Sequence, residues 1–253
     1  MAPRFRALAD DEIMRKHAGE VVTAADRACE ELLTELLRDI VDAPVIGEEA
    51  TAASPVELDR FMADGHDGGP AWIVDPIDGT RRFVSGEPEY GVMVAFAERG
   101  RTTAAWILLP QLDQVVTAQL GAGAERNGEP LVMPEPAADP GQWQVLLKNH
   151  HMPAEVRDAV AGRAERFRAL DHQGSSAALE YLQVAQGKNT ALGFWRTKPW
   201  DHAPGALIVE EAGGLVLRPD GRRYGPTQHG EGILSAHASI ADEARRLVFG
   251  DAG

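Results

Sequence analysis

Two aspartates at the end of one short apolar run are candidates for binding a metal ion. The run 71–74 (AWIV) reads as a buried strand and leads directly into Asp75-Pro76-Ile77-Asp78. Proline fixes φ and removes a donor, so we expect the chain to turn sharply here, with both carboxylates on one side. Two close carboxylates repel each other unless a cation lies between them, and Mg²⁺ prefers oxygen ligands. The ordinary alternative is an Asp-Pro turn followed by a helix cap.

The next two residues, Gly79 and Thr80, add a candidate phosphate-binding site. Glycine allows a ligand to approach the backbone closely. If a helix starts here, its first N–H groups point outward and attract an anion such as phosphate. Thr80 is either a helix-start residue or a residue whose hydroxyl holds a water.

Three further acidic residues have chemical potential but also an ordinary structural explanation. Glu48 follows a short apolar run and, with Glu49, is typical of a solvated loop. Asp201 stands where a helix begins and is a good N-cap residue. Asp26, three residues after Thr23, fits the capping-box pattern at the start of a periodic helix.

Composition excludes some classes of function. The 253 residues are 44% hydrophobic and 25% charged, and their formal net charge is -14. Such a surface repels nucleic acid polymers and anionic membranes. An anionic substrate needs a local cation, which a bound divalent metal would supply. The single Cys29 cannot form an internal disulfide, and no run of 18 apolar residues occurs, so we expect a cytoplasmic protein without a membrane anchor.

Periodicity predicts two halves that position these residues. The proline-rich stretch 133–141 marks the boundary between an α+β half, 1–135, and an α/β half, 142–253. The first half has helices over 8–16, 23–40 and 55–62 and strands over 71–74, 90–97, 102–109 and 114–120. The second has strands over 145–147, 167–170 and 214–217 and helices over 153–165, 175–186, 203–212 and 238–248. Tight turns are predicted at 98–101 and at Asn127-Gly128.

Five segments together resemble the inositol monophosphatase family, in the family's order and at about its spacing. They are EVVTAAD (20–26), GEE (47–49), DPIDGT (75–80), WDHAPG (200–205) and EAGG (211–214). The likeness covers nearly the whole chain. It implies a five-layered α-β-α-β-α sandwich of the sugar-phosphatase type and Mg²⁺-dependent hydrolysis of a phosphate monoester by a metal-activated water.

The resemblance also implies roles for individual residues. Glu48 and Asp75, with the carbonyl of Ile77, would hold one metal, and Asp75, Asp78 and Asp201 a second. Glu48 would also steer water near a third, weaker site, so two or three Mg²⁺ ions are expected. Thr80 and Asp26 would orient and deprotonate the attacking water, and Gly79 and Thr80 would hold the phosphate.

Several positions depart from the family pattern on the substrate side. Lys16 stands near the family's lysine, although Arg15 competes for that place. Arg81 and Arg82 replace Thr-Asn and either bind a second anionic group or form a solvated helix face. Phe194 stands where inositol-type members place a hydroxyl-binding Glu, seven residues before Asp201.

The Gly174-Ser175-Ser176 segment matches the family's substrate-side residues. We therefore expect a small phosphorylated metabolite as the partner: a sugar or polyol phosphate (fructose-1,6-bisphosphate included), histidinol phosphate or a 3′-phosphoadenosine nucleotide. Family members often form dimers, so a homodimer is expected. The alternative is a catalytically silent member that binds metal or phosphate as a regulator.

Overall fold

A seven-stranded sheet forms the larger platform of the molecule. The computed structural model describes residues 4–9, 12–15, 21–149, 151–228 and 230–250. The sheet follows chain order through β3 (Val45–Gly47), β4 (Ala71–Asp78), β5 (Gly91–Glu98), β6 (Arg101–Leu109), β7 (Gln114–Gln119), β8 (Gly123–Arg126) and β9 (Glu129–Leu131). Only β3 and β4 are parallel; every later neighbour is antiparallel.

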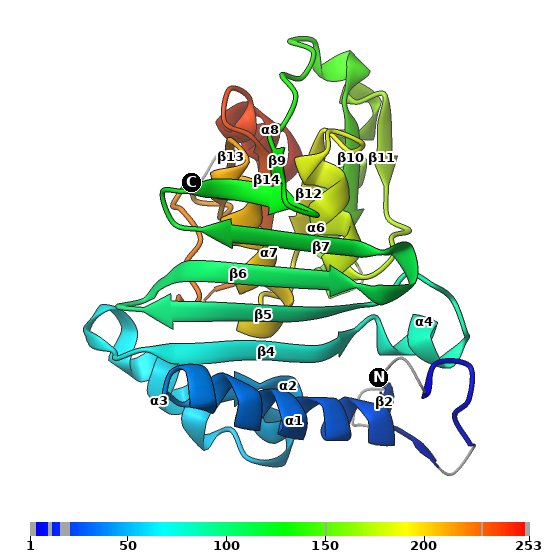
Figure 1. Cartoon of the computed structure of the whole chain (residues 1–253). Coiled ribbons are helices and arrows are strands. Elements are labelled where there is room, and N and C mark those ends of the chain that lie inside the picture. The colour runs from blue at the N-terminus through cyan, green and yellow to red at the C-terminus, as the bar shows by residue number, and fades with distance from the viewer. Residues whose placement is uncertain (1–3, 10–11, 16–20, 150, 229, 251–253) are drawn as a thin grey trace.

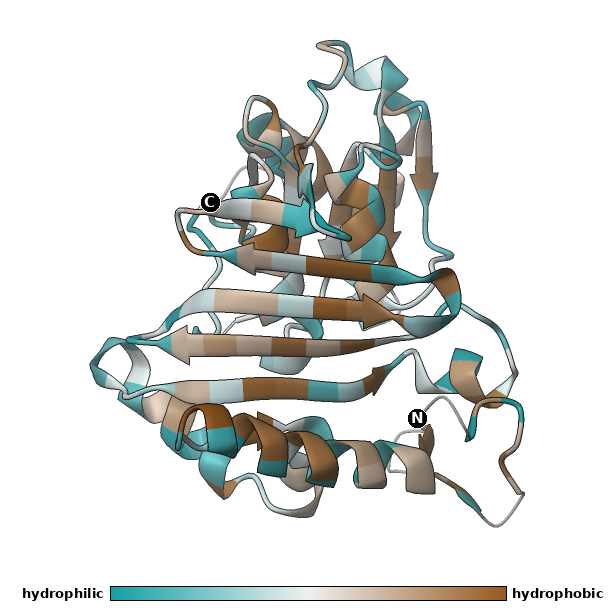
Figure 2. Ribbon diagram, viewed as in Figure 1, coloured by the Kyte–Doolittle hydropathy of each residue, from teal (hydrophilic) through white to brown (hydrophobic). Residues whose placement is uncertain are grey.

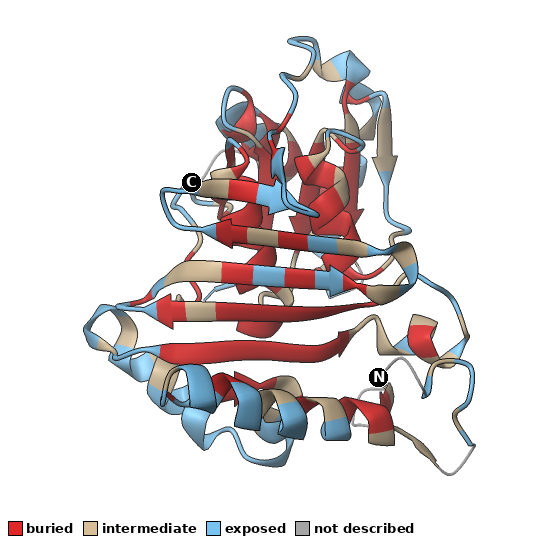
Figure 3. Cartoon of the chain, in the orientation of Figure 1, coloured by how far each residue is buried: buried red, intermediate tan, exposed pale blue. Residues whose placement is uncertain are grey.

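Two of the hairpins that build this sheet turn where the sequence predicts. Arg99 and Gly100 join β5 to β6 with φ of 50° and 70°, and Asn127 and Gly128 join β8 to β9 with φ of 52° and 80°. Two consecutive residues with positive φ match the right-handed twist of antiparallel strands. β4 is buried over all but its last residue (Figure 3).

The smaller sheet has five strands and is mixed. Its order is β11 (Ala169–Asp171), β10 (Gln144–Lys148), β12 (Ala191–Phe194), β14 (Ile233–His237) and β13 (Gly214–Leu217). β10 runs parallel to both β11 and β12, whereas β14 is antiparallel to its two neighbours.

Helices fill the spaces on and between the sheets and complete five layers (Figure 1). α1 (Ala24–Ile40) covers one face of the large sheet. α6 (Ala177–Ala185) and α7 (Pro199–Glu211) lie between the sheets, in a core that both sheets share. α5 (Ala154–Ala161) and α8 (Ala241–Phe249) cover the outer face of the small sheet. The predicted α-β-α-β-α sandwich is confirmed.

Apolar side chains concentrate on the strands and on the two middle helices (Figure 2). Tyr181 of α6 packs directly against the backbone of α7 because Gly205 has no side chain: a Cβ there would stand 2.1 Å from the ring of Tyr181. A glycine inside a helix costs about 1 kcal/mol relative to alanine, and here it makes room for an aromatic ring. None of the described helices is long and apolar enough to cross a bilayer.

The remaining helices are short: α2 (Glu48–Ala53), α3 (Val56–Asp64) and α4 (Thr80–Val84). The helix expected over 8–16 is wrong for its described part. Ile13–Arg15 form strand β1, which pairs with β2 (Val21–Thr23), so strand pairing overrides local periodicity. α7 begins at Pro199, four residues before the predicted 203, because proline suits the first helical position.

Candidate active site

The end of β4 carries the two aspartates that the sequence singled out, but not on a sharp turn. The ladder between β4 and β5 shifts register between Asp75 and Asp78, so the Asp-Pro-Ile-Asp segment is a bulge inside the strand. Proline lacks an N–H and is tolerated at such irregularities. Asp75 is 2% exposed, and its Oδ1 accepts a hydrogen bond of 3.1 Å from the N–H of Ile77.

Asp78 is held by a helix from the other half of the chain. Its Oδ2 accepts a 2.6 Å hydrogen bond from the N–H of Ala178, in the first turn of α6. Burial raises the pKa of Asp78, while hydrogen bonds from Ala178, Ala177 and Ser176 oppose that rise. The positive end of α6 therefore stabilises a carboxylate that stands 100 residues earlier in the chain.

Glu48 and Asp201 also occupy first turns of helices. Glu48 is the first residue of α2, and Asp201 is the third residue of α7, whose N-cap is Lys198. Asp201 is therefore not an N-cap itself. Burial raises the pKa of Asp201 to about 8, with the charges of Glu48 and Asp78 adding to the effect.

Glu30 positions Glu48 and was missed by sequence reasoning. This buried side chain on α1 accepts hydrogen bonds from the N–H groups of Glu49 (2.8 Å) and Ala50 (2.7 Å), and so closes the start of α2. Gly47 gives it room, since a Cβ there would stand 2.3 Å from the Glu30 carboxyl carbon. The sequence signal that could have identified Glu30 is its position on the inward face of an amphipathic helix.

Asp26 and Thr80 form a pair beside these acids. The Thr80 Oγ1 lies 3.0 Å from Asp26 Oδ1 and 3.0 Å from the carbonyl oxygen of Ile77. The predicted capping box is also present, because Thr23 and Asp26 bond reciprocally at the start of α1. Burial raises the pKa of Asp26, and hydrogen bonds from Thr23 and Thr80 oppose this. One carboxylate thus caps a helix through Oδ2 and faces the site through Oδ1.

Gly79 connects the acidic side to the opposite wall. It is the N-cap of α4 with φ of 82°, and a Cβ there would stand 2.8 Å from the Cβ of Ser176. Only glycine combines this left-handed conformation with so close a neighbour. Gly79 and Thr80 line a cavity of about 630 Å³ together with the acids.

The wall facing the acids is the predicted Gly174-Ser175-Ser176 segment. Arg82 donates a 2.8 Å hydrogen bond to the carbonyl oxygen of Gly174, and Lys148 donates one of 3.1 Å to that of Ser175. Arg82 also pairs with Glu87 and, at 2.7 Å, with Glu89. Lys148 lies 2.8 Å from the buried Glu180, whose pKa burial raises to about 7.

Phe194 lines the same cavity but is 7% exposed. Its ring centroid lies 5.6 Å from that of Tyr181 and 4.6 Å from that of His202. Lys16 lies outside the described residues. For Arg15 the structure describes only its place in β1.

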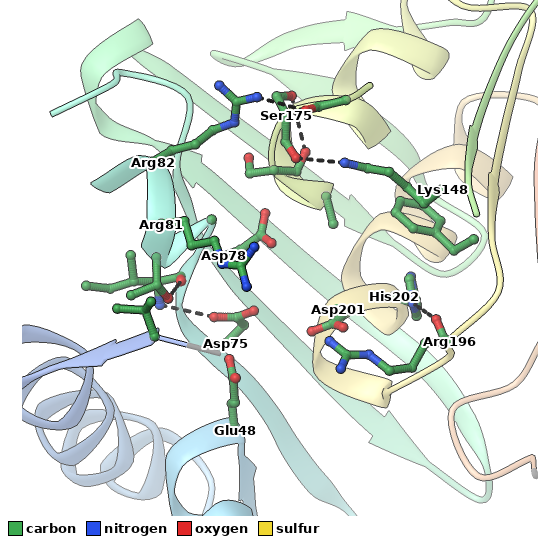
Figure 4. A pocket seen from close by; sticks show the side chains of 18 of the residues that line it. Glu48, Asp75, Asp78, Arg81, Arg82, Lys148, Ser175, Arg196, Asp201 and His202 are labelled. Atoms are coloured by element: carbon green, nitrogen blue, oxygen red, sulfur yellow. Dashed lines mark hydrogen bonds between the residues drawn. The ribbon is translucent and has the colours of Figure 1, made fainter. Parts of the chain in front are cut away.

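The four acids Glu48, Asp75, Asp78 and Asp201 line one cavity, and Glu48, Asp75 and Asp201 point toward one another in it (Figure 4). The pKa of Asp75 is raised well above its usual range by burial and by the charges of the other three. Such mutual repulsion suits a divalent cation. As they stand, no three described His, Cys, Asp or Glu side chains are grouped closely enough to hold a metal ion by themselves. Mg²⁺, which keeps several waters, fits this open arrangement of carboxylates.

Comparison with known proteins identifies the family. The model of the inositol monophosphatase family matches residues 3–248. The chain belongs to this family. It is 33% identical over 237 residues to inositol monophosphatase 2 of Solanum lycopersicum, covering 90% of this chain and 86% of that protein. It is 30% identical over 230 residues to a histidinol-phosphatase of Chlorobaculum parvum, covering 90% and 83%.

Solved structures agree with this assignment. A Thermotoga maritima IMPase matches with a TM-score of 0.79 and 26% identity, over 98% of this chain and 90% of that one. The family contains metal-dependent phosphatases of varied substrate preference. This chain is an inositol-monophosphatase-like phosphatase.

Proposed function

We propose that this family member is a Mg²⁺-dependent phosphomonoesterase that hydrolyses a small phosphorylated metabolite. The observation that carries the proposal is the convergence of four carboxylates from three separate elements, α2, β4 and α7, on one cavity, with the Thr80–Asp26 pair beside them. A cluster of buried carboxylates that raise one another's pKa destabilises the folded protein unless a ligand balances the charge. Such clusters are therefore typical of functional sites.

Metal binding would use the acids in two overlapping sets. Glu48, Asp75 and the carbonyl of Ile77 would hold one Mg²⁺, and Asp75, Asp78 and Asp201 a second, with a third, weaker site near Glu48. When bound, the metals lower the pKa of a coordinated water and neutralise charge on the phosphate.

The chain's own groups would prepare the attacking water. Thr80 has one hydroxyl proton, and both of its close neighbours, Asp26 Oδ1 and the Ile77 carbonyl, are acceptors. The two acceptors compete for this one proton, and the Thr80 oxygen keeps lone-pair capacity to accept a hydrogen bond from a water. The proton of that water would pass through Thr80 toward Asp26, the nearest carboxylate.

Phe194 bears on which leaving group the site can accept. Phe194 supports Tyr181 and His202 and offers no hydroxyl-binding carboxylate. This weighs against myo-inositol 1-phosphate and leaves other sugar or polyol phosphates, histidinol phosphate and 3′-phosphoadenosine nucleotides. Homodimer formation and a cytoplasmic location stay predictions.

The test is hydrolysis of a panel of phosphorylated metabolites and an aryl phosphate by the purified protein, with and without Mg²⁺. We expect turnover only with the metal, and none of it in Asp75→Asn. An absence of Mg²⁺-dependent turnover across the panel would overturn the proposal and favour a silent, regulatory family member.

A further inference from the structure

His202 holds the backbone of a segment that lines the cavity. It is the fourth residue of α7 and 1% exposed. Its Nε2 lies 2.8 Å from the carbonyl oxygen of Arg196, and its Nδ1 lies 3.1 Å from the hydroxyl of Tyr181. A carbonyl only accepts, so Nε2 carries the ring proton. In the neutral ring Nδ1 then accepts a hydrogen bond from the Tyr181 hydroxyl.

The segment 194–198 is also held from its other side. The N–H of Gly232 donates a 2.7 Å hydrogen bond to the carbonyl oxygen of Trp195. The Trp195 Nε1 donates one of 2.6 Å to Glu231, and the Thr197 hydroxyl donates one of 2.7 Å to the carbonyl oxygen of Gly230. With His202 on one side and residues 230–232 on the other, the backbone at residue 196 is fixed.

The side chain of Arg196 extends from this fixed backbone into the cavity, and its guanidinium lies beside Asp201 (Figure 4). Three other described arginines and lysines line the cavity. Arg82 and Lys148 brace the opposite wall through carbonyl oxygens and carboxylates, and Arg81 lies on the side of the acids (Figure 4). The backbone carbonyl of Arg196 is anchored by His202.

We propose that Arg196 is a specificity-determining residue for phosphomonoesters that carry a second anionic group, and that His202 and Tyr181 are positioning residues that fix the Arg196 backbone. The proposal rests on the phosphomonoesterase function proposed above. A guanidinium binds a carboxylate or phosphate through two parallel hydrogen bonds. Because Arg196 stands beside Asp201, the second anion must lie within a few atoms of the phosphate that is cleaved.

The test uses two substrates that are both phosphate esters of a primary alcohol and differ in one group: 3-phosphoglycerate, with a carboxylate, and sn-glycerol 3-phosphate, with a hydroxymethyl. We expect the intact protein with Mg²⁺ to prefer 3-phosphoglycerate by about 10-fold or more in kcat/KM, the usual effect of a hydrogen bond to a charged group. Arg196→Gln should bring the ratio close to one, mainly through KM. Arg60→Gln, which changes an exposed arginine on α3, is the matched control and should keep the wild-type ratio.

The positioning role is tested at His202. His202→Gln keeps a donor for the Arg196 carbonyl and should retain most of the preference, whereas His202→Leu should lose it as Arg196→Gln does. Circular dichroism melting checks that each variant folds, and if His202→Leu does not, Arg196→Gln decides. Equal turnover of both substrates by the wild type, or an unchanged ratio in Arg196→Gln, would overturn this inference alone. Turnover of neither substrate by protein that still hydrolyses the aryl phosphate would overturn this inference alone, whereas loss of turnover across the whole panel as well would overturn it together with the proposed function.

Discussion

The acidic side of the cavity and the wall opposite it are held in place by different means. Each acid sits on a local element: Asp75 on the bulge of β4, and Glu48 and Asp201 in first turns of helices. The wall at 174–176 depends on long side chains from elsewhere, Arg82 and Lys148, which donate to consecutive carbonyl oxygens.

The two sides differ as much in electrostatics. Burial raises the pKa values of Asp75, Asp78 and Asp201, and repulsion from the neighbouring acids adds to the rise. On the wall, Arg82 faces Glu89 and Lys148 faces Glu180, so opposite charges are paired. The acidic side is therefore arranged to bind a positively charged ion. The paired charges on the wall instead hold the backbone of residues 174–176 in one conformation.

The largest expected effect comes from removing the acid that would bridge two metals. Asp75→Asn should lower kcat/KM by roughly 10³-fold or more, and Asp26→Asn, which leaves the metal ligands intact, by about 100-fold. Steady-state kinetics with saturating Mg²⁺ would measure both. Equal and mild losses in the two variants would contradict the assignment of their roles.

A smaller effect is expected from disturbing the wall. A Cβ at Gly174 would stand 1.9 Å from Glu180 Oε1 and 2.7 Å from Lys148 Nζ. Gly174→Ala should therefore displace the segment and raise KM by about 10-fold, with less effect on kcat. Gly162→Ala, whose Cβ meets nothing closer than 3.6 Å, is the control. A wild-type KM in Gly174→Ala would show that the wall does not position the substrate.

The smallest effect concerns stability of the metal-free protein. The folded-state pKa of Asp201, about 8, lies above its ordinary value of 3.8. Its contribution to stability is therefore full below about pH 4 and is lost as the pH rises through about 8. Between about pH 5 and 8, Tm should fall by roughly 5 °C more in the wild type than in Asp201→Asn. Parallel Tm curves for the two proteins would refute this.

Much of the fold was predictable because its signals are local. Alternating and continuous apolar runs predicted β4 to β7, and the glycine-containing segments 98–101 and Asn127-Gly128 predicted the two hairpin turns. The helix expected over 8–16 failed because β1 pairs with β2, a partner that periodicity does not reveal. The sharp turn expected at Pro76 failed because β4 continues past it as a bulge.

The sequence by itself determined which acids stand at this site and in what order, since the motifs around Asp26, Glu48, Asp75, Asp78 and Asp201 identify the family. The family resemblance that these motifs carry also implied the five layers. These features depend on residue type and on short-range spacing, both of which can be read directly from the amino-acid sequence.

Only the tertiary structure decided what holds the site together. It brings the start of α6 onto Asp78, places Glu30 under α2, and sets His202 against the carbonyl of Arg196. Each of these contacts joins a side chain to a backbone group on another element. Every residue has the same backbone N–H and C=O groups, so residue types do not indicate which backbone group a side chain will contact. The packing of the elements determines that partner.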